Sequence, residues 1–127
     1  MTRLKIDNDY LQHTLARLLE IPSPTGFTDT IVRYVSGELQ RLGLDVALTR
    51  RGAIRAVRPG VEERGARTIV SPLDTLSAQV KSLKDNGRSS LVPISTWSAR
   101  IAQGARVTTF PEKGGCRGTG LPRTVTG

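Results

Sequence analysis

The chain has 127 residues, of which 37% are apolar, and a formal net charge of +8, which predicts about one globular domain. It holds no run of about 18 apolar residues for a membrane span, and its first residues lack the apolar core of a signal peptide, so a cytoplasmic protein is expected. Its single cysteine, Cys116, excludes an internal disulfide. One cysteine and one histidine also cannot supply the four ligands of a structural zinc site.

The charge is distributed unevenly along the chain. Residues 1–49 hold five Lys or Arg and six Asp or Glu, whereas residues 50–127 hold fourteen and five. A basic half indicates either a nucleic-acid partner or the absence of an acidic partner region. Proteins that bind single strands interleave aromatic side chains with basic ones. The arginine-rich stretch 50–67 has no aromatic residue, so nucleic-acid binding is the less favoured alternative.

Two amphipathic helices are expected first. The apolar stripe of the first helix is Leu11, Leu15, Leu18 and Leu19. Asp7 or Asn8 can cap this helix, and the only histidine, His13, lies roughly opposite the stripe and is interpreted as solvated. A loop with two prolines follows at residues 21–26.

The second helix is expected to begin after this loop, with Thr25 or Thr28 as its cap. Its apolar face comprises Phe27, Ile31, Val32, Val35, Leu39 and Leu42. Gly43 fits the position that ends such a helix. Residues 44–49 and 53–57 then predict a hairpin.

Residues 68–70, Thr-Ile-Val, predict a short buried strand that ends before Pro72, because proline cannot continue a central strand ladder. Asp74 follows, where a strand of an open α/β sheet gives way to a loop. Such strand ends are where these folds place their chemistry. The alternative for Asp74 is an ordinary turn or cap residue.

The pattern changes near Leu76. Strands are expected at residues 78–83 and 90–94, joined by the turn signal Asn86-Gly87, and at residues 104–110. The glycine-rich stretch 113–120 predicts a turn or a flexible tail, because no helix with Lys-Ser/Thr follows it as in a phosphate-binding loop. We therefore divide the chain into an α/β segment, residues 1–75, and the start of a small all-β module with a disordered tail, residues 76–127.

Nucleophilic catalysis is not predicted. The chain has no Gly-x-Ser-x-Gly motif, Cys116 lies among glycines without a visible base, and the only histidine is expected to face solvent. Asp74 is the one residue with a specific role to offer.

Several stretches taken together resemble a known family. They are Leu19-Glu-Ile-Pro-Ser-Pro-Thr-Gly26, Arg50-Arg-Gly-Ala-Ile-Arg-Ala56 and Val70-Ser-Pro-Leu-Asp-Thr75. In this order they resemble the N-terminal part of the glutamyl/deblocking (tetrahedral, TET-type) dinuclear-metal aminopeptidases. The later stretches Leu91–Arg100 and Gly104–Val107 are similar to a bacterial branch associated with synthesis of the osmoprotectant N-acetylglutaminylglutamine amide.

The resemblance implies a zinc-exopeptidase-like α/β/α sandwich, here incomplete, into which a small PDZ-like β-barrel is inserted after a His-x-Asp strand. It implies two divalent metal ions, zinc or cobalt, that polarise the scissile carbonyl and generate hydroxide, and peptides as substrates. Asp74 falls on the aspartate that holds a metal-binding histidine, so it is the catalytic residue carried over. The histidine position holds Pro72, which cannot bind a metal.

The expectation is therefore a fragment or degenerate member of this family that is inactive by itself and binds no metal. Half an α/β sheet exposes a strand edge and apolar faces, which predicts self-association. The alternatives are a non-catalytic binding or assembly module that adds a strand to a peptide, and a small basic nucleic-acid-binding protein.

Overall fold

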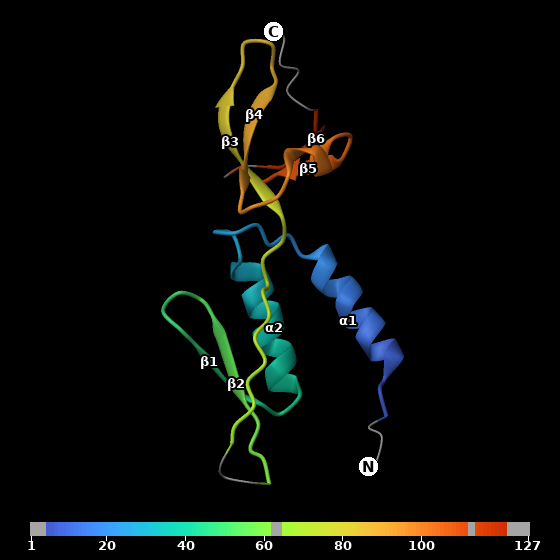
Figure 1. The fold of residues 1–127 in the computed structure, drawn as a ribbon, viewed down its shortest axis with the longest axis vertical. Coiled ribbons are helices and arrows are strands. Elements are labelled where there is room, and N and C mark those ends of the chain that lie inside the picture. Colours follow the sequence, from blue (N-terminus) through green and yellow to red (C-terminus); the bar gives the residue numbers. More distant parts are fainter. Residues whose placement is uncertain (1–4, 62–64, 112–113, 122–127) are drawn as a thin grey trace. The chain divides into compact units, whose positions relative to one another are not determined.

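A computed structural model describes residues 5–61, 65–111 and 114–121, and Figure 1 shows the course of the chain. The chain divides into an N-terminal unit, Met1–Thr75, and a C-terminal unit, Leu76–Gly127. Across the described residues there are two α-helices, one short 3-10 helix and three two-stranded antiparallel sheets. The fold is thus a small α/β structure, and we describe each unit by itself.

Helix α1 spans Asn8–Glu20, and its start follows from a capping residue. The Oδ1 atom of Asp7 accepts a hydrogen bond from the backbone N–H of Tyr10 at 2.9 Å, which confirms one of the two predicted caps. His13 is exposed, as predicted. No residue of α1 is buried, and Leu19 in the apolar stripe is 70% exposed.

Helix α2 spans Asp29–Arg41 and packs against a hairpin formed by β1, Asp45–Leu48, and β2, Ile54–Val57. Ile31 is 2% exposed and is the only buried apolar side chain in the described part of the chain. Gly43 follows the helix at φ 78°, a conformation that glycine adopts without strain, which confirms the predicted helix end. The predicted hairpin is also confirmed.

The C-terminal unit begins with a second hairpin. Strands β3, Ser77–Leu83, and β4, Ser89–Ile94, pair antiparallel with a register shift between Val80 and Ser82. The turn between them contains Asn86 and Gly87, and Gly87 has φ 75°, so the hairpin predicted from the Asn-Gly pair is present.

A third hairpin pairs β5, Arg106–Thr109, with β6, Cys116–Thr119. The prediction that the glycine-rich stretch is only a turn or a tail is wrong for β6. Strand β6 forms because β5 supplies its partner in an antiparallel ladder, and glycine-rich composition does not predict such a partner. The 3-10 helix η1, Ala99–Ala102, lies close to the end of β6, because a Cβ atom on Gly120 would be 2.2 Å from the Ala102 carbonyl oxygen. The predicted disordered tail beyond Leu121 lies outside the described residues.

The stretch that precedes Asp74 differs most from its prediction. Residues 65–74 form no regular strand, and Ile69 and Val70 are 95% and 89% exposed. The predicted buried strand at 68–70 is therefore wrong. A strand is stabilised by cross-strand pairs, and no described strand pairs with this segment.

None of the helices in the described residues is both long and apolar enough to span a membrane.

Candidate functional site

Asp74 lies against the loop that precedes α2. The Oγ1 atom of Thr25 donates a hydrogen bond to Oδ2 of Asp74 at 2.7 Å, although 49 positions separate the two residues. This distance is normal for a hydroxyl donor and a carboxylate acceptor. Both residues are exposed, so the bond is reachable by solvent.

Backbone contacts support the same junction. The N–H of Thr75 donates to the carbonyl oxygen of Ser23 at 2.9 Å, and Pro24 and Thr75 form an isolated parallel bridge. The loop is held in a turn by the N–H of Phe27, which donates to the carbonyl oxygen of Pro24 at 2.7 Å. Gly26 occupies this turn at φ 87°, where a side chain would be strained.

Ser23 sits at the centre of this junction and is 1% exposed. Its hydroxyl has no hydrogen-bond partner among the described protein atoms. A buried hydroxyl without a partner costs free energy. The hydrogen bonds from Thr75 to Ser23 and from Thr25 to Asp74 must therefore offset that cost.

The residues around Asp74 do not fit a dinuclear metal centre. Protein metal ions are held by several deprotonated Cys, His or carboxylate groups. No set of three or more His, Cys, Asp or Glu residues that could hold an ion occurs in the part of the chain that the structure describes. Pro72, at the position expected for a histidine ligand, offers no donor atom. We therefore derive no chemical step through a metal in this chain.

The other sequence candidates do not gather into a site. The exposed residues among them are His13 and the free Cys116. The described members of the arginine-rich stretch are also exposed, and they are Arg50, Arg51, Arg55, Arg58 and Arg67. Arg64 lies outside the described residues.

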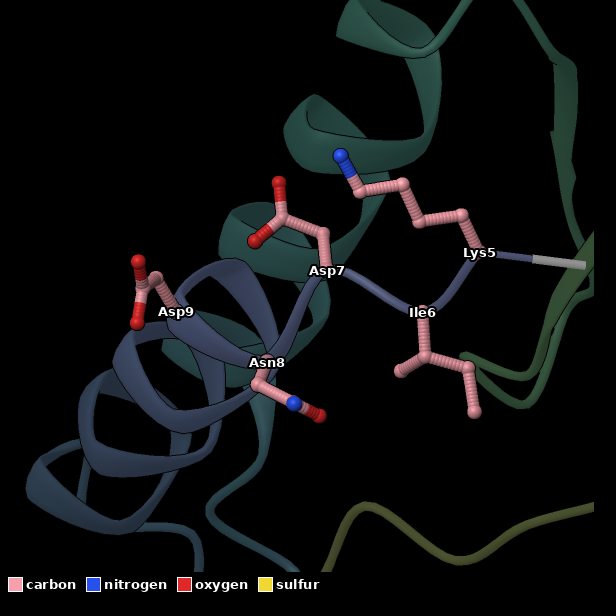
Figure 2. Close-up of a pocket in the computed structure, with 5 residues that line it drawn as sticks. All are labelled: Lys5, Ile6, Asp7, Asn8 and Asp9. Carbon is pink, nitrogen blue, oxygen red and sulfur yellow. The ribbon is translucent and has the colours of Figure 1, made fainter.

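A hollow beside the first turn of α1 is lined by Lys5–Asp9. Figure 2 shows these five side chains fanned out along the chain, with Ile6 and Asn8 on one side and Lys5 and Asp7 on the other. One oxygen of Asp7 is already engaged by Tyr10. Consecutive exposed residues that do not converge make no binding site.

Thr25 has a different role from the predicted one. The sequence favours Thr25 or Thr28 as the cap of α2, but Thr28 occupies the cap position without a side-chain bond, and the Thr25 hydroxyl binds Asp74 instead. No local pattern links two residues so far apart, so only the folded chain reveals this partner.

Comparison with known proteins gives one family match and two relatives. The profile of the M42 glutamyl aminopeptidase family matches residues 52–125. The chain is 32% identical over 74 residues to the Bacillus subtilis protein named "Putative aminopeptidase YhfE", a match that covers 58% of this chain and 21% of that protein. It is 26% identical over 98 residues to the glutamyl aminopeptidase of Lactococcus lactis subsp. cremoris, covering 76% of this chain and 28% of that protein. The chain thus spans between a fifth and a third of the length of these relatives.

Proposed function

Because the chain belongs to the M42 glutamyl aminopeptidase family, we propose that it is a region of a metal-dependent aminopeptidase. In complete form such a peptidase would hydrolyse N-terminal residues from peptides. By itself, the chain is proposed to be inactive. The observation that carries this proposal is that the matched region contains Pro72 and Asp74, while no metal-holding group exists among the described residues.

The exposed segment before Asp74 supports an incomplete catalytic fold. Ile69 and Val70 are β-branched, lie outside any regular strand and are almost fully exposed, which suits a strand whose neighbours are missing. We propose that Met1–Thr75 corresponds to part of an α/β/α sandwich, and that Leu76–Gly127 corresponds to part of an inserted PDZ-like β-barrel. The three open hairpins and the division of the chain at Thr75 support this assignment.

Asp74 is proposed to occupy the position of the aspartate that orients a metal-binding histidine in the complete peptidase. With Pro72 two residues earlier, no imidazole is available for it to orient. Zinc or cobalt, peptide substrates and the osmoprotectant-associated branch are proposals that rest on the resemblance of the sequence. A cytoplasmic location is a proposal that rests on the composition of the chain.

The test is an aminopeptidase assay of the purified 127-residue chain with glutamyl and leucyl p-nitroanilides, with and without added zinc or cobalt. We expect no hydrolysis above the metal-only background. Pro72→His by itself should not restore hydrolysis, because one added ligand does not make a dinuclear site. Turnover by the wild-type chain, together with about two metal ions per chain, would overturn the proposal of inactivity.

A binding or assembly role is the second candidate, and the open sheets favour it. The hairpin of β3 and β4 has two strands and therefore two unpaired edges, which can accept an extended peptide. Gel filtration of the chain mixed with the intact L. lactis relative tests this role. Co-elution that is lost when Val80 and Val92 are changed to aspartate would support assembly with a peptidase, and separate elution would count against it.

A further inference from the structure

The junction between the loop 22–28 and residues 74–75 is held by one side-chain and one backbone hydrogen bond, and neither involves a metal or a substrate. We infer that Asp74 in this chain acts as a positioning residue, whose carboxylate fastens the loop 22–28 through the hydroxyl of Thr25. This inference does not depend on the proposed peptidase function. It concerns what the side chain of Asp74 does in the chain as it stands.

Among the described residues, this junction is the only hydrogen-bonded anchor of the segment at 58–61 and 65–75. The described residues in 58–61 and 65–73 make no hydrogen bond to another element of the described chain. The next residues, Asp74 and Thr75, make two hydrogen bonds to the loop, one from a side chain and one from the backbone. A segment held at so few points opens easily, so the loss of either bond should lower the free energy of local opening.

The side-chain bond of Asp74 and the backbone bond of Thr75 are geometrically coupled. Asp74 and Thr75 are adjacent, and so are Pro24 and Thr25, which pairs the two stretches in parallel through the bridge of Pro24 with Thr75. Loss of the Thr25 hydroxyl bond therefore loosens the backbone bond from the Thr75 amide to Ser23. The exchange of that one amide proton reports the state of the junction.

The hydrogen-bond partner of Asp74 distinguishes a carboxylate that fastens a loop from one that serves a metal. The only hydrogen-bond partner found for Asp74 in the described chain is a neutral hydroxyl. A hydroxyl also donates to the oxygen of an amide, although that bond is weaker than one to a carboxylate. A fastening role thus tolerates Asp74→Asn. A metal-associated role depends on the negative charge and would not.

The experiment measures amide hydrogen exchange of the full chain by NMR. Thr25→Val and Asp74→Ala should each speed exchange of the Thr75 amide about fivefold, the size expected for one lost hydrogen bond. The double variant should be no faster than the faster single variant, because both remove the same bond. Thr25→Ser and Asp74→Asn, which keep a donor and an acceptor, should stay within about twofold of wild type.

Matched controls come from residues of the same type that make no such bond. Thr30→Val in α2 and Asp45→Ala in β1 should leave Thr75 exchange unchanged, since both side chains are exposed. The amides of the β1–β2 hairpin serve as an internal reference within the same unit. They should keep the wild-type rate in every junction variant.

Three results would overturn the inference. One is unchanged Thr75 exchange in Thr25→Val. Another is equal acceleration of Thr75 and of the β1–β2 amides, which indicates general unfolding instead of a local anchor. The third is stoichiometric zinc in equilibrium dialysis against zinc chloride that is lost in both Asp74→Ala and Asp74→Asn, because that result assigns the carboxylate to a metal.

Discussion

Individual residues in this chain are constrained mainly where the backbone approaches itself closely. Gly120 is the tightest case, because an added Cβ would be 2.2 Å from the carbonyl oxygen of Ala102. The backbone of Gly120 also exchanges hydrogen bonds with its neighbours, since its carbonyl accepts from Gly104 and its N–H donates to Ala105. The residue therefore cannot shift away from Ala102 without breaking these bonds.

We predict that Gly120→Ala destabilises the C-terminal unit by about 1–3 kcal/mol, the usual cost of overpacking a fixed site. The measurement is urea unfolding followed by the fluorescence of Trp97, whose Nε1 donates to the Ser77 carbonyl at 2.9 Å within the same unit. Gly118→Ala is the matched control in β6, because its nearest neighbour would be Val107 Cγ2 at 3.8 Å. A control as damaging as Gly120→Ala would refute the close-approach argument.

At the scale of elements, capping shows where a local pattern was sufficient and where it was not. Both helices were expected to have a polar cap, and both begin where the pattern placed them. At α1 the Asp7 carboxylate binds a backbone N–H. At α2 the cap residue Thr28 makes no side-chain bond, because its φ of −107° and ψ of 1° depart from the extended backbone typical of a bonded cap.

Asp7→Ala should therefore reduce the stability of α1 by about 1 kcal/mol, whereas Thr28→Ala should change the stability of α2 by about 0.5 kcal/mol or less. Because α1 has no buried residue, the loss of stability in Asp7→Ala should appear as fraying of α1 alone. It is read from faster exchange of the Tyr10 and Leu11 amides. Similar losses of helix stability in Asp7→Ala and Thr28→Ala would show that the Asp7 hydrogen bond does not stabilise α1.

At the scale of the whole molecule, the described part of the chain buries few of its side chains. Ile31 and Ser23 are the only fully buried side chains in the described residues, and many large apolar side chains are exposed. A domain of this length ordinarily buries a majority of the surface of its unfolded chain. Such exposure favours association with other chains.

We predict that the wild-type chain self-associates, and that the double variant Ile69→Lys, Val70→Lys shifts it toward the monomer. The reason is that this segment combines β-branched residues, near-complete exposure and an unpaired backbone. Sedimentation velocity over a concentration series measures the shift. Leu19→Lys is the control for an exposed apolar residue whose backbone lies in a helix, α1, and it should have little effect. A wild-type monomer at all concentrations would contradict the prediction.

The sequence was a good guide wherever structure depends on neighbours a few residues apart. Helix stripes, the Asp7 cap, the Gly43 helix end and the Asn86-Gly87 turn all follow from local sterics and hydrogen bonding, and all are present. The family resemblance also came from ordered short stretches.

Pairing over longer distances decided the rest. Strand β6 formed because β5 lies beside it, and residues 68–70 formed no strand because no described strand lies beside them to pair with. The bond between Thr25 and Asp74 joins positions that only the folded backbone brings together. Strand pairing and side-chain contacts each depend on two segments that are distant in the sequence. A local sequence pattern describes only one of those segments.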